Sequence, residues 1–453
     1  MHGATVTAVA HGGAPLPRRS PTSAVMPAPR GGPNVSAQIV PSCSGNRSAL
    51  GDRHCSLTSS TASRSAACRA SWTIGREDAS CRGAGWDDDE WHDVTDPVKD
   101  ATASRLAAAQ AEFDSEVVYL NTASLGLPPR RSLQALQEVL TQWRAGRASP
   151  PDYDEPLAAA RASYAALVGV DRANVAVGSQ VSVFAGLVAA ALPDGSEVLT
   201  VPGEFTSIVF PFLAQAERGI RVREVPLEHL ADAVTARTAL VAVSAVQSAD
   251  GRLADLAALV EAAAATGARV LLDTTQAAGW LPIDASRFAY TTGGGYKWLL
   301  APRGTCFFTV QPQLADRLVP HTAGWYAGAE PWSSIYGGPL RLATDARRFD
   351  VSPAWHSWVA QAPALDLLTG VGVPALHAHA VGLANRFRAT VGVPAGDSAI
   401  VSLAAEQDIG PRLDRAGVVG SVRAGRLRLA FHINNSVDDA DQAAEALVDH
   451  VSP

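Results

Sequence analysis

Apolar residues recur three or four positions apart in several segments of the chain, and short runs rich in β-branched residues lie between those segments. The first pattern predicts helices over 130–145, 156–167, 180–191, 252–266, 355–368 and 437–450. The second predicts strands over 174–177, 198–201, 222–225, 239–246, 270–272, 288–292 and 305–310. Because strands and helices alternate, we expect an α/β fold with a mostly parallel sheet covered by helices on both faces.

Residues 1–97 differ from the rest of the chain. Ser, Arg, Pro, Gly and Ala dominate them, and no helical or strand period persists. We predict a disordered or wrongly included upstream extension, and an organelle transit peptide is the alternative. Four of the five cysteines lie here, at Cys43, Cys55, Cys68 and Cys81, and their spacing fits no zinc motif, which leaves a disulfide knot as the less favoured option.

The overall composition is typical of a globular protein with substantial cores, since 47% of the 453 residues are apolar and 18% are charged. Apolar runs such as 239–246 are far shorter than the roughly 20 residues that cross a bilayer. The net charge of −7 argues against a surface that follows phosphate groups. We therefore expect neither a membrane nor a nucleic acid as partner.

Lysine is almost absent from the chain. Only Lys99 and Lys297 are lysines among the 37 basic residues, and the rest are arginines. A guanidinium stays protonated and cannot form an imine, so a lysine among arginines indicates chemistry that needs a primary amine. A surface lysine without a role remains the alternative for Lys297.

An acid and this lysine follow two neighbouring predicted strands. Asp273 ends the run 269–273, Gln276 comes three positions later, and Lys297 follows a second strand and the flexible triplet 293–295. A carboxylate in such a place can be a helix cap, a metal ligand or the partner of a cationic heterocycle. Pyridoxal phosphate needs an amine for a Schiff base and an anion beside its pyridine nitrogen, which Lys297 and Asp273 could supply. Gln276 could then reach the ring hydroxyl.

Three further positions have both a functional and an ordinary interpretation. Ser179 and Gln180 open the predicted helix 180–191, where they would bind a phosphate or cap the helix. Phe205 would stack on a cofactor ring or belong to the core. Arg428, on a predicted strand that begins at Arg426, would bind a substrate carboxylate or face solvent. The tryptophan-rich stretch 325–332 would line the substrate pocket or a dimer interface.

Five segments between residues 114 and 449 resemble, in order and spacing, the aminotransferase class V family, which includes cysteine desulfurases, kynureninases, isopenicillin N epimerases and some aminotransferases. They are Tyr119-Leu-Asn-Thr-Ala-Ser-Leu-Gly, Gly178-Ser179-Gln180, Asp273-Thr-Thr-Gln276, Gly295-Tyr296-Lys297-Trp298, and Arg428 with Asn435-Ser436. The resemblance implies the fold type I architecture of pyridoxal-phosphate enzymes and a homodimer. It implies a large domain over 98–349 with a seven-stranded sheet, a segment 112–128 near the active site, and a small α/β domain over 350–453.

The same resemblance implies a set of site residues. Lys297 would hold pyridoxal 5'-phosphate as a Schiff base and act as the catalytic residue. The other cofactor contacts would be Asp273, Gln276, Ser179, Gln180, Phe205, Tyr296 and Ser248, the last near the place of an asparagine in many relatives. Arg428 and Asn121 would bind the substrate, an amino acid with a free carboxylate, and no metal is expected.

Departures from the family pattern narrow the function. Gly294-Gly295-Tyr296 replaces the Ser-x-His that many desulfurases carry before the lysine, and Phe205 replaces a histidine over the ring. The loops over 321–357 contain no cysteine, and Cys306 lies inside a predicted strand, which disfavours a persulfide-forming desulfurase. The segment 346–355 looks most like the branch of isopenicillin N epimerase-like proteins.

From this resemblance we expect a cytoplasmic aminotransferase that acts at the α-carbon of an amino acid. An epimerase or carbon–sulfur lyase of the same family is the alternative. A catalytically silent protein that binds pyridoxal phosphate is a third possibility. A nucleotide-binding loop at the triplet 293–295 is not supported, because the spacing of such loops is missing.

Overall fold

The computed structural model describes residues 97–406 and 409–453, which belong to one compact unit. Apart from Pro97, the extension predicted over residues 1–97, with its four cysteines, lies outside the described residues. The domain boundary near residue 350 also stays a prediction, since the described chain does not divide there.

A seven-stranded sheet forms the centre of the molecule. Its strands, in spatial order, are β2 (Val175–Gly178), β8 (Cys306–Val310), β7 (Tyr290–Gly294), β6 (Arg269–Asp273), β5 (Thr238–Ser244), β3 (Glu197–Thr200) and β4 (Arg221–Glu224). All neighbours pair in parallel except β8, which runs antiparallel to both β2 and β7. The mostly parallel sheet of seven strands predicted from the sequence is therefore confirmed, and each predicted strand differs from the observed one by only a few residues.

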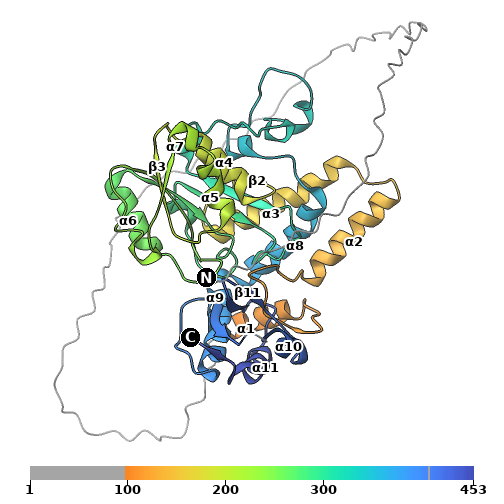
Figure 1. Ribbon diagram of the computed structural model, residues 1–453. Coiled ribbons are helices and arrows are strands. Elements are labelled where there is room, and N and C mark those ends of the chain that lie inside the picture. The colour runs from red at the N-terminus through yellow and green to blue at the C-terminus, as the bar shows by residue number, and fades with distance from the viewer. Residues whose placement is uncertain (1–96, 407–408) are drawn as a thin grey trace, which may run out of the picture. The chain divides into compact units, whose positions relative to one another are not determined.

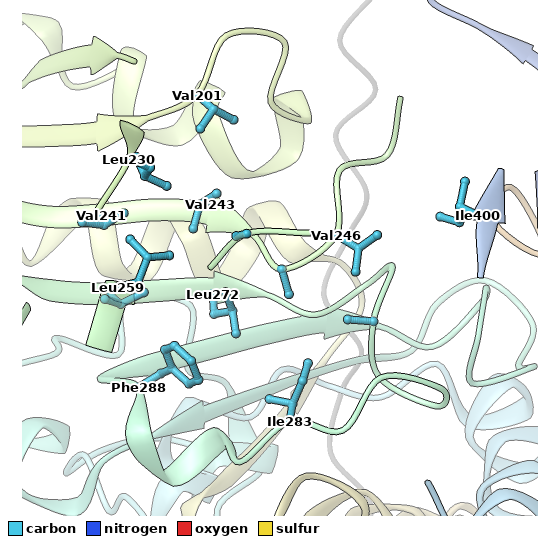
Figure 2. Packing of buried hydrophobic residues seen from close by; sticks show 14 of the residues in the cluster. Val201, Leu230, Val241, Val243, Val246, Leu259, Leu272, Ile283, Phe288 and Ile400 are labelled. Carbon is cyan, nitrogen blue, oxygen red and sulfur yellow. The ribbon is translucent and has the colours of Figure 1, made fainter. Parts of the chain in front are cut away.

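The two faces of this sheet carry separate apolar cores. In β5, Val241 and Val243 face one side and pack in a cluster with Leu259 of α6, while Leu240 and Ala242 belong to the cluster on the other side. Figure 2 shows the first cluster, which extends from the sheet to Ile400 in the C-terminal part of the chain. Burial on both faces explains why these strands read as continuous apolar runs.

Helices cover both faces. Between residues 97 and 371 they are α1 (Pro97–Gln110), α2 (Arg130–Arg144), α3 (Asp154–Val168), α4 (Val181–Ala190), α5 (Thr206–Leu213), α6 (Leu256–Thr266), α7 (Pro312–Ala315) and α8 (Trp355–Val371). α8 packs against α2 and α3, and α4 packs against α5. The sequence patterns did not predict α1 or α5, and α5 carries an internal proline, Pro211, which masks its period.

A second sheet lies in the C-terminal part. Its strands, in spatial order, are β11 (Ser421–Arg423), β12 (Arg426–Ala430), β9 (Ile400–Ala405) and β13 (Val451–Ser452). The helices of this part are α9 (Val373–Thr390), α10 (Ile409–Arg415) and α11 (Val437–Leu447), and α9 and α11 lie side by side (Figure 1). A short parallel pair, β1 (Val118–Tyr119) and β10 (Val418–Val419), connects the N-terminal segment to this part.

In the described part of the chain, no single helix is long and apolar enough to cross a membrane. Only α8 and α9 taken together reach that length and composition, and they meet at an angle of 85°.

A buried ion pair joins α3 to the segment before α8. Arg161 Nη2 lies 2.6 Å from Asp350 Oδ2, and the two side chains are 8% and 1% exposed. Asp350 also accepts a hydrogen bond from Val177 N at 2.8 Å. Burial raises the pKa of Asp350 even though Arg161 opposes the shift. The pair therefore holds β2, the strand that leads into α4, in place.

Replacing Asp350 with alanine is expected to lower the free energy of unfolding by about 3–5 kcal/mol, because it leaves the buried Arg161 unpaired. Denaturant unfolding measures the change. Asp366→Ala is the matched control: Asp366 pairs with Arg131 at 3.1 Å but is 75% exposed, so its loss should cost about 1 kcal/mol at most. Equal costs for the two variants would contradict this account.

Candidate active site

A cavity of about 200 Å³ lies at the carboxyl ends of the parallel strands, where α/β sheets bind ligands. Its lining is formed by the residues that follow β2, β3, β5, β6 and β7. They are Ser179, Gln180, Val181, Phe205, Thr206, Ser207, Ser244, Ser248, Asp273, Thr275, Gln276, Gly294, Tyr296, Lys297 and Arg303. Eight of the ten site residues predicted from the sequence are in this set. Arg428 contacts Ser248 of the lining, and Asn121 is not among the lining residues.

Lys297 is buried, with 5% of its surface exposed, so the surface-lysine alternative is wrong. Its Nζ lies 5.3 Å from the centre of the Phe205 ring and 5.6 Å from that of Tyr296. Burial lowers the pKa of Lys297 to about 8, and nearby guanidinium groups, first that of Arg428, add to this effect, while Asp273 opposes it. A larger neutral fraction near neutral pH makes this amine a better nucleophile and base.

Close backbone packing fixes the position of Lys297. Gly126 N donates to the Tyr296 carbonyl at 2.9 Å, and a Cβ on Gly126 would overlap the Lys297 carbonyl oxygen. A Cβ on Gly295 would overlap the side chains of Gln361 and Thr305. The prediction that 293–295 is a flexible triplet is therefore wrong: these glycines are buried and allow close approach, and two of them belong to β7.

Asp273, at the end of β6, is 3% exposed. Its Oδ1 accepts a hydrogen bond from Thr275 N at 2.8 Å, and Thr275 Oγ1 in turn accepts one from Gly294 N at 3.0 Å. Burial raises the pKa of Asp273 above its ordinary value, and hydrogen bonds from Thr275 act in the opposite direction. Asp273 caps no helix in the described chain, and that chain contains no group of three His, Cys, Asp or Glu side chains able to hold a metal.

A second buried carboxylate, Glu204, lies close to Asp273 and was not predicted from the sequence. Ser244 donates to it from both its backbone N, at 2.7 Å, and its Oγ, at 2.6 Å, and Gln247 Nε2 donates at 3.0 Å. The charge of Glu204 contributes to the raised pKa of Asp273. Glu204 also accepts a hydrogen bond from Phe205 N at 2.7 Å and thereby orients the loop that carries Phe205.

Phe205 precedes α5 and is 42% exposed, so the interpretation as a core residue is wrong. Its ring forms part of the cavity wall next to Lys297. An aromatic ring at this place can stack on a planar ligand but cannot transfer a proton.

The helix α4 points its N-terminus at the cavity. Gln180 is its N-cap residue and no side chain caps the helix, so the interpretation of Ser179 as an ordinary cap is wrong. Free backbone amides at such an end favour an anion. Arg303, which the sequence did not indicate, lines the same cavity, and its guanidinium lies 5.0 Å from the centre of the Tyr296 ring.

Gln276 has its amide fully hydrogen-bonded. Its Nε2 donates to the Ala123 carbonyl and to Ser248 Oγ, both at 3.0 Å, and its Oε1 accepts from Trp298 Nε1 at 2.8 Å. Both amide hydrogens are thus engaged, and Gln276 holds Ser248 Oγ at the edge of the cavity.

Arg428 is buried, with 2% of its surface exposed, so the solvated interpretation is wrong. Its Nη1 donates to the carbonyl oxygen of Ser248 and, at 3.3 Å, to Ser248 Oγ. Arg428 Nε is a buried donor without a hydrogen-bond partner, and Asn121 Oδ1 is a buried acceptor without one. A substrate carboxylate would satisfy the Arg428 donor.

Trp325 and Trp332 do not line the cavity in the described chain. Their rings pack at 5.0 Å, and Trp332 Nε1 donates to Asp154 at 2.6 Å. The prediction that this stretch forms the substrate pocket is not supported by this arrangement.

The donors at this site fit pyridoxal 5'-phosphate. A buried amine of lowered pKa, a buried carboxylate, an aromatic wall and an uncapped helix N-terminus are the groups that this cofactor requires. The fold and the site therefore define the class of pyridoxal-phosphate enzymes of fold type I.

The chain belongs to the aminotransferase class-V family, whose model matches residues 118–392. This membership confirms the family, the cofactor and the enzyme class that the five sequence segments predicted. The chain is 31% identical over 297 residues to isopenicillin N epimerase of Streptomyces clavuligerus. These residues cover 59% of this chain and 72% of the relative. It is 29% identical to kynureninase of Deinococcus radiodurans, over 62% of this chain and 73% of that protein.

The fold is also that of a solved cystine C-S lyase in complex with cysteine persulfide. The TM-score is 0.67 and the identity 20%, over 74% of this chain and 98% of the other. At 20% identity, this similarity supports a shared fold alone.

Proposed function

We propose that this protein is an aminotransferase that acts at the α-carbon of an amino acid. Membership of the aminotransferase class-V family leaves the reaction open, and amino transfer is what we infer. Support comes from Lys297: it lines the cavity, and burial lowers its pKa to about 8, a value suited to proton transfer near neutral pH.

Bound pyridoxal phosphate supplies an aldehyde for the substrate amine and an electron-accepting ring that makes the α-hydrogen acidic. Asp273 supplies the carboxylate for a cationic ring nitrogen, and the amides at the start of α4 supply donors for the phosphate. Arg428 binds the substrate carboxylate. Lys297 Nζ would remove the α-proton and deliver it to another carbon, which gives amino transfer. Epimerisation would instead need a proton delivered to the opposite face of the α-carbon.

Amino transfer is favoured because neither aromatic residue beside Lys297 is suited to be a second proton carrier. Phe205, whose ring centre lies 5.3 Å from Lys297 Nζ, has no proton to transfer, and burial raises the pKa of Tyr296. A persulfide-forming desulfurase is disfavoured because Cys306 is fully buried in β8, where burial raises the pKa of its thiol to about 12. An epimerase or a carbon–sulfur lyase is the second candidate, in view of the relatives named above.

The experiment offers single L-amino acids to the protein reconstituted with pyridoxal phosphate in deuterated water. The proposal predicts one equivalent of the 2-oxo acid per site and no D-amino acid. Deuterium in both enantiomers without oxo acid would contradict it and support an epimerase, and sulfide release from cystine would support a lyase. A protein that binds the cofactor but turns over no amino acid would be the silent binding protein.

Covalent uptake of the cofactor is expected to depend on pH through Lys297. The neutral amine is the nucleophile, so the uptake rate should rise with pH and level off above about 8, where the pKa of Lys297 lies. Asp273→Asn should shift this midpoint to lower pH, because the Asp273 carboxylate raises the pKa of Lys297. Stopped-flow absorbance measures the rate. A rise that continues to the ordinary lysine value of 10.5 would contradict this role of burial.

We also propose a homodimer and a cytoplasmic location. Large apolar side chains on the described surface support the first proposal, among them Trp143 and Phe210, each 61% exposed. Light scattering after gel filtration tests it, and a monomer at micromolar concentration would contradict it.

A further inference from the structure

Three arginines lie on one face of the hairpin formed by β11 and β12. Its strands pair antiparallel with Arg423 opposite Arg426 and Ser421 opposite Arg428. Opposed residues, and residues two apart on one strand, share a face of the sheet. The turn between the strands has positive φ at both Ala424 and Gly425, which keeps it tight. The side chains of Arg423, Arg426 and Arg428 therefore lie on the same face of the hairpin.

Two of these arginines donate to the same hydroxyl. Arg428 Nη2 donates to Ser124 Oγ at 2.8 Å, and Arg423 Nη2 donates to it at 3.1 Å. Arg426 instead donates to the side chain and carbonyl of Ser402, both at 3.2 Å. The Ser124 hydroxyl thus accepts from two guanidinium groups. Ser124 lies two residues before Gly126, which packs against the backbone of Lys297.

Neither Arg423 nor Arg428 forms an ion pair with a carboxylate in residues 97–406 and 409–453. Their closeness is unfavourable by itself, since like charges repel and Arg428 is buried. Arg428 Nε is in addition a buried donor without a partner. An arrangement of this kind is stabilised when anionic groups of a ligand bind to it.

The α-carboxylate of a substrate can pair with only one of the two guanidinium groups, Arg423 or Arg428. Arg428, the buried one, lies against Ser248 at the cavity wall, whereas Arg423 is exposed at the end of the hairpin. The cofactor phosphate would instead be held by the backbone amides at the start of α4, next to Ser179. Both Arg423 and Arg428 lower the pKa of Lys297, so each lies near enough to act on charges at the reacting amine.

We propose that Arg423 and Arg428 form a subsite for two acidic groups, and that the preferred substrate is an amino acid with a second carboxylate in its side chain. Arg428 binds the α-carboxylate and Arg423 the side-chain carboxylate. This inference rests on the proposed function, since it names the substrate class of the same site.

The test compares ligands of equal chain length on the holoenzyme. Glutarate and valerate are titrated by calorimetry, and L-glutamate and L-norvaline are compared as substrates by kcat/KM. We expect glutarate and L-glutamate to be preferred at least about tenfold. Arg423→Gln should reduce this preference to within about twofold, Arg423→Lys should retain part of it, and Arg415→Gln, which changes an exposed arginine on α10, should leave the preference as it is.

Equal binding of glutarate and valerate by the unaltered protein would overturn the inference, as would an Arg423→Gln variant that keeps the preference. Covalent cofactor on Lys297 is measured in the same samples. If it is present and L-norvaline reacts as well as L-glutamate, the subsite fails while the proposed function stands. If the cofactor is absent or no amino acid reacts, the proposed function itself fails.

Discussion

Replacing Lys297 with alanine is expected to abolish covalent attachment of pyridoxal phosphate and to lower turnover of any amino acid by at least about a thousandfold. The variant lacks both the nucleophile that holds the cofactor and the base that moves the α-proton. The purified Lys297→Ala protein should lack the absorbance band, near the edge of the visible range, that arises when the cofactor is attached to lysine. Because Lys297 is buried in a tight backbone environment, circular dichroism should accompany the measurement to show that the fold is kept.

Lys99 provides the matched control, since it is the only other lysine of the chain. Lys99→Arg should keep the absorbance and the turnover of the unaltered protein. A Lys297→Ala variant that retains the full band would contradict the assignment of the cofactor lysine.

Replacing Asp273 with asparagine is expected to lower turnover by about a hundredfold to a thousandfold, while the cofactor still attaches to Lys297. The reason is electrostatic: an amide cannot hold the positive charge on a ring nitrogen that a carboxylate stabilises. Glu204 should not take the place of Asp273, because hydrogen bonds from Ser244, Gln247 and Phe205 hold its carboxylate where it is. Single-turnover kinetics with the preferred amino acid measures the effect.

The matched control for this variant is Asp284→Asn. Asp284 is exposed and caps a short helix at Ala285–Arg287, so its change should leave turnover within about twofold. If Asp273→Asn also stayed within this range, Asp273 would not be the partner of the ring nitrogen.

The central sheet could be predicted because most of its strands are short runs of apolar and β-branched residues. Burial on both faces makes β5 and β6 rich in Val, Leu and Ala, and each ends in a polar residue, Ser244 or Asp273. Helix α9 escaped prediction for the opposite reason. It carries His377, His379 and Gly382 within an alanine-rich segment, so its apolar period is weak even though Leu383 and Phe387 are buried.

The positions of Lys297 and Asp273 could be predicted because both follow neighbouring strands and because lysine is rare in this chain. The contacts around Arg428 could not. Ser124, which shares its hydroxyl between Arg423 and Arg428, lies about 300 positions away in the sequence, and no local pattern joins them. Glu204 was missed for the same reason, since its role depends on hydrogen bonds from β5.

Borohydride reduction of the protein reconstituted with pyridoxal phosphate, followed by peptide mapping, tests the central claim most directly. The account predicts one reduced pyridoxyl group per chain, on the peptide that contains Lys297, and none on the peptide that contains Lys99. A protein that takes up no cofactor, or a label on Lys99 alone, would contradict it.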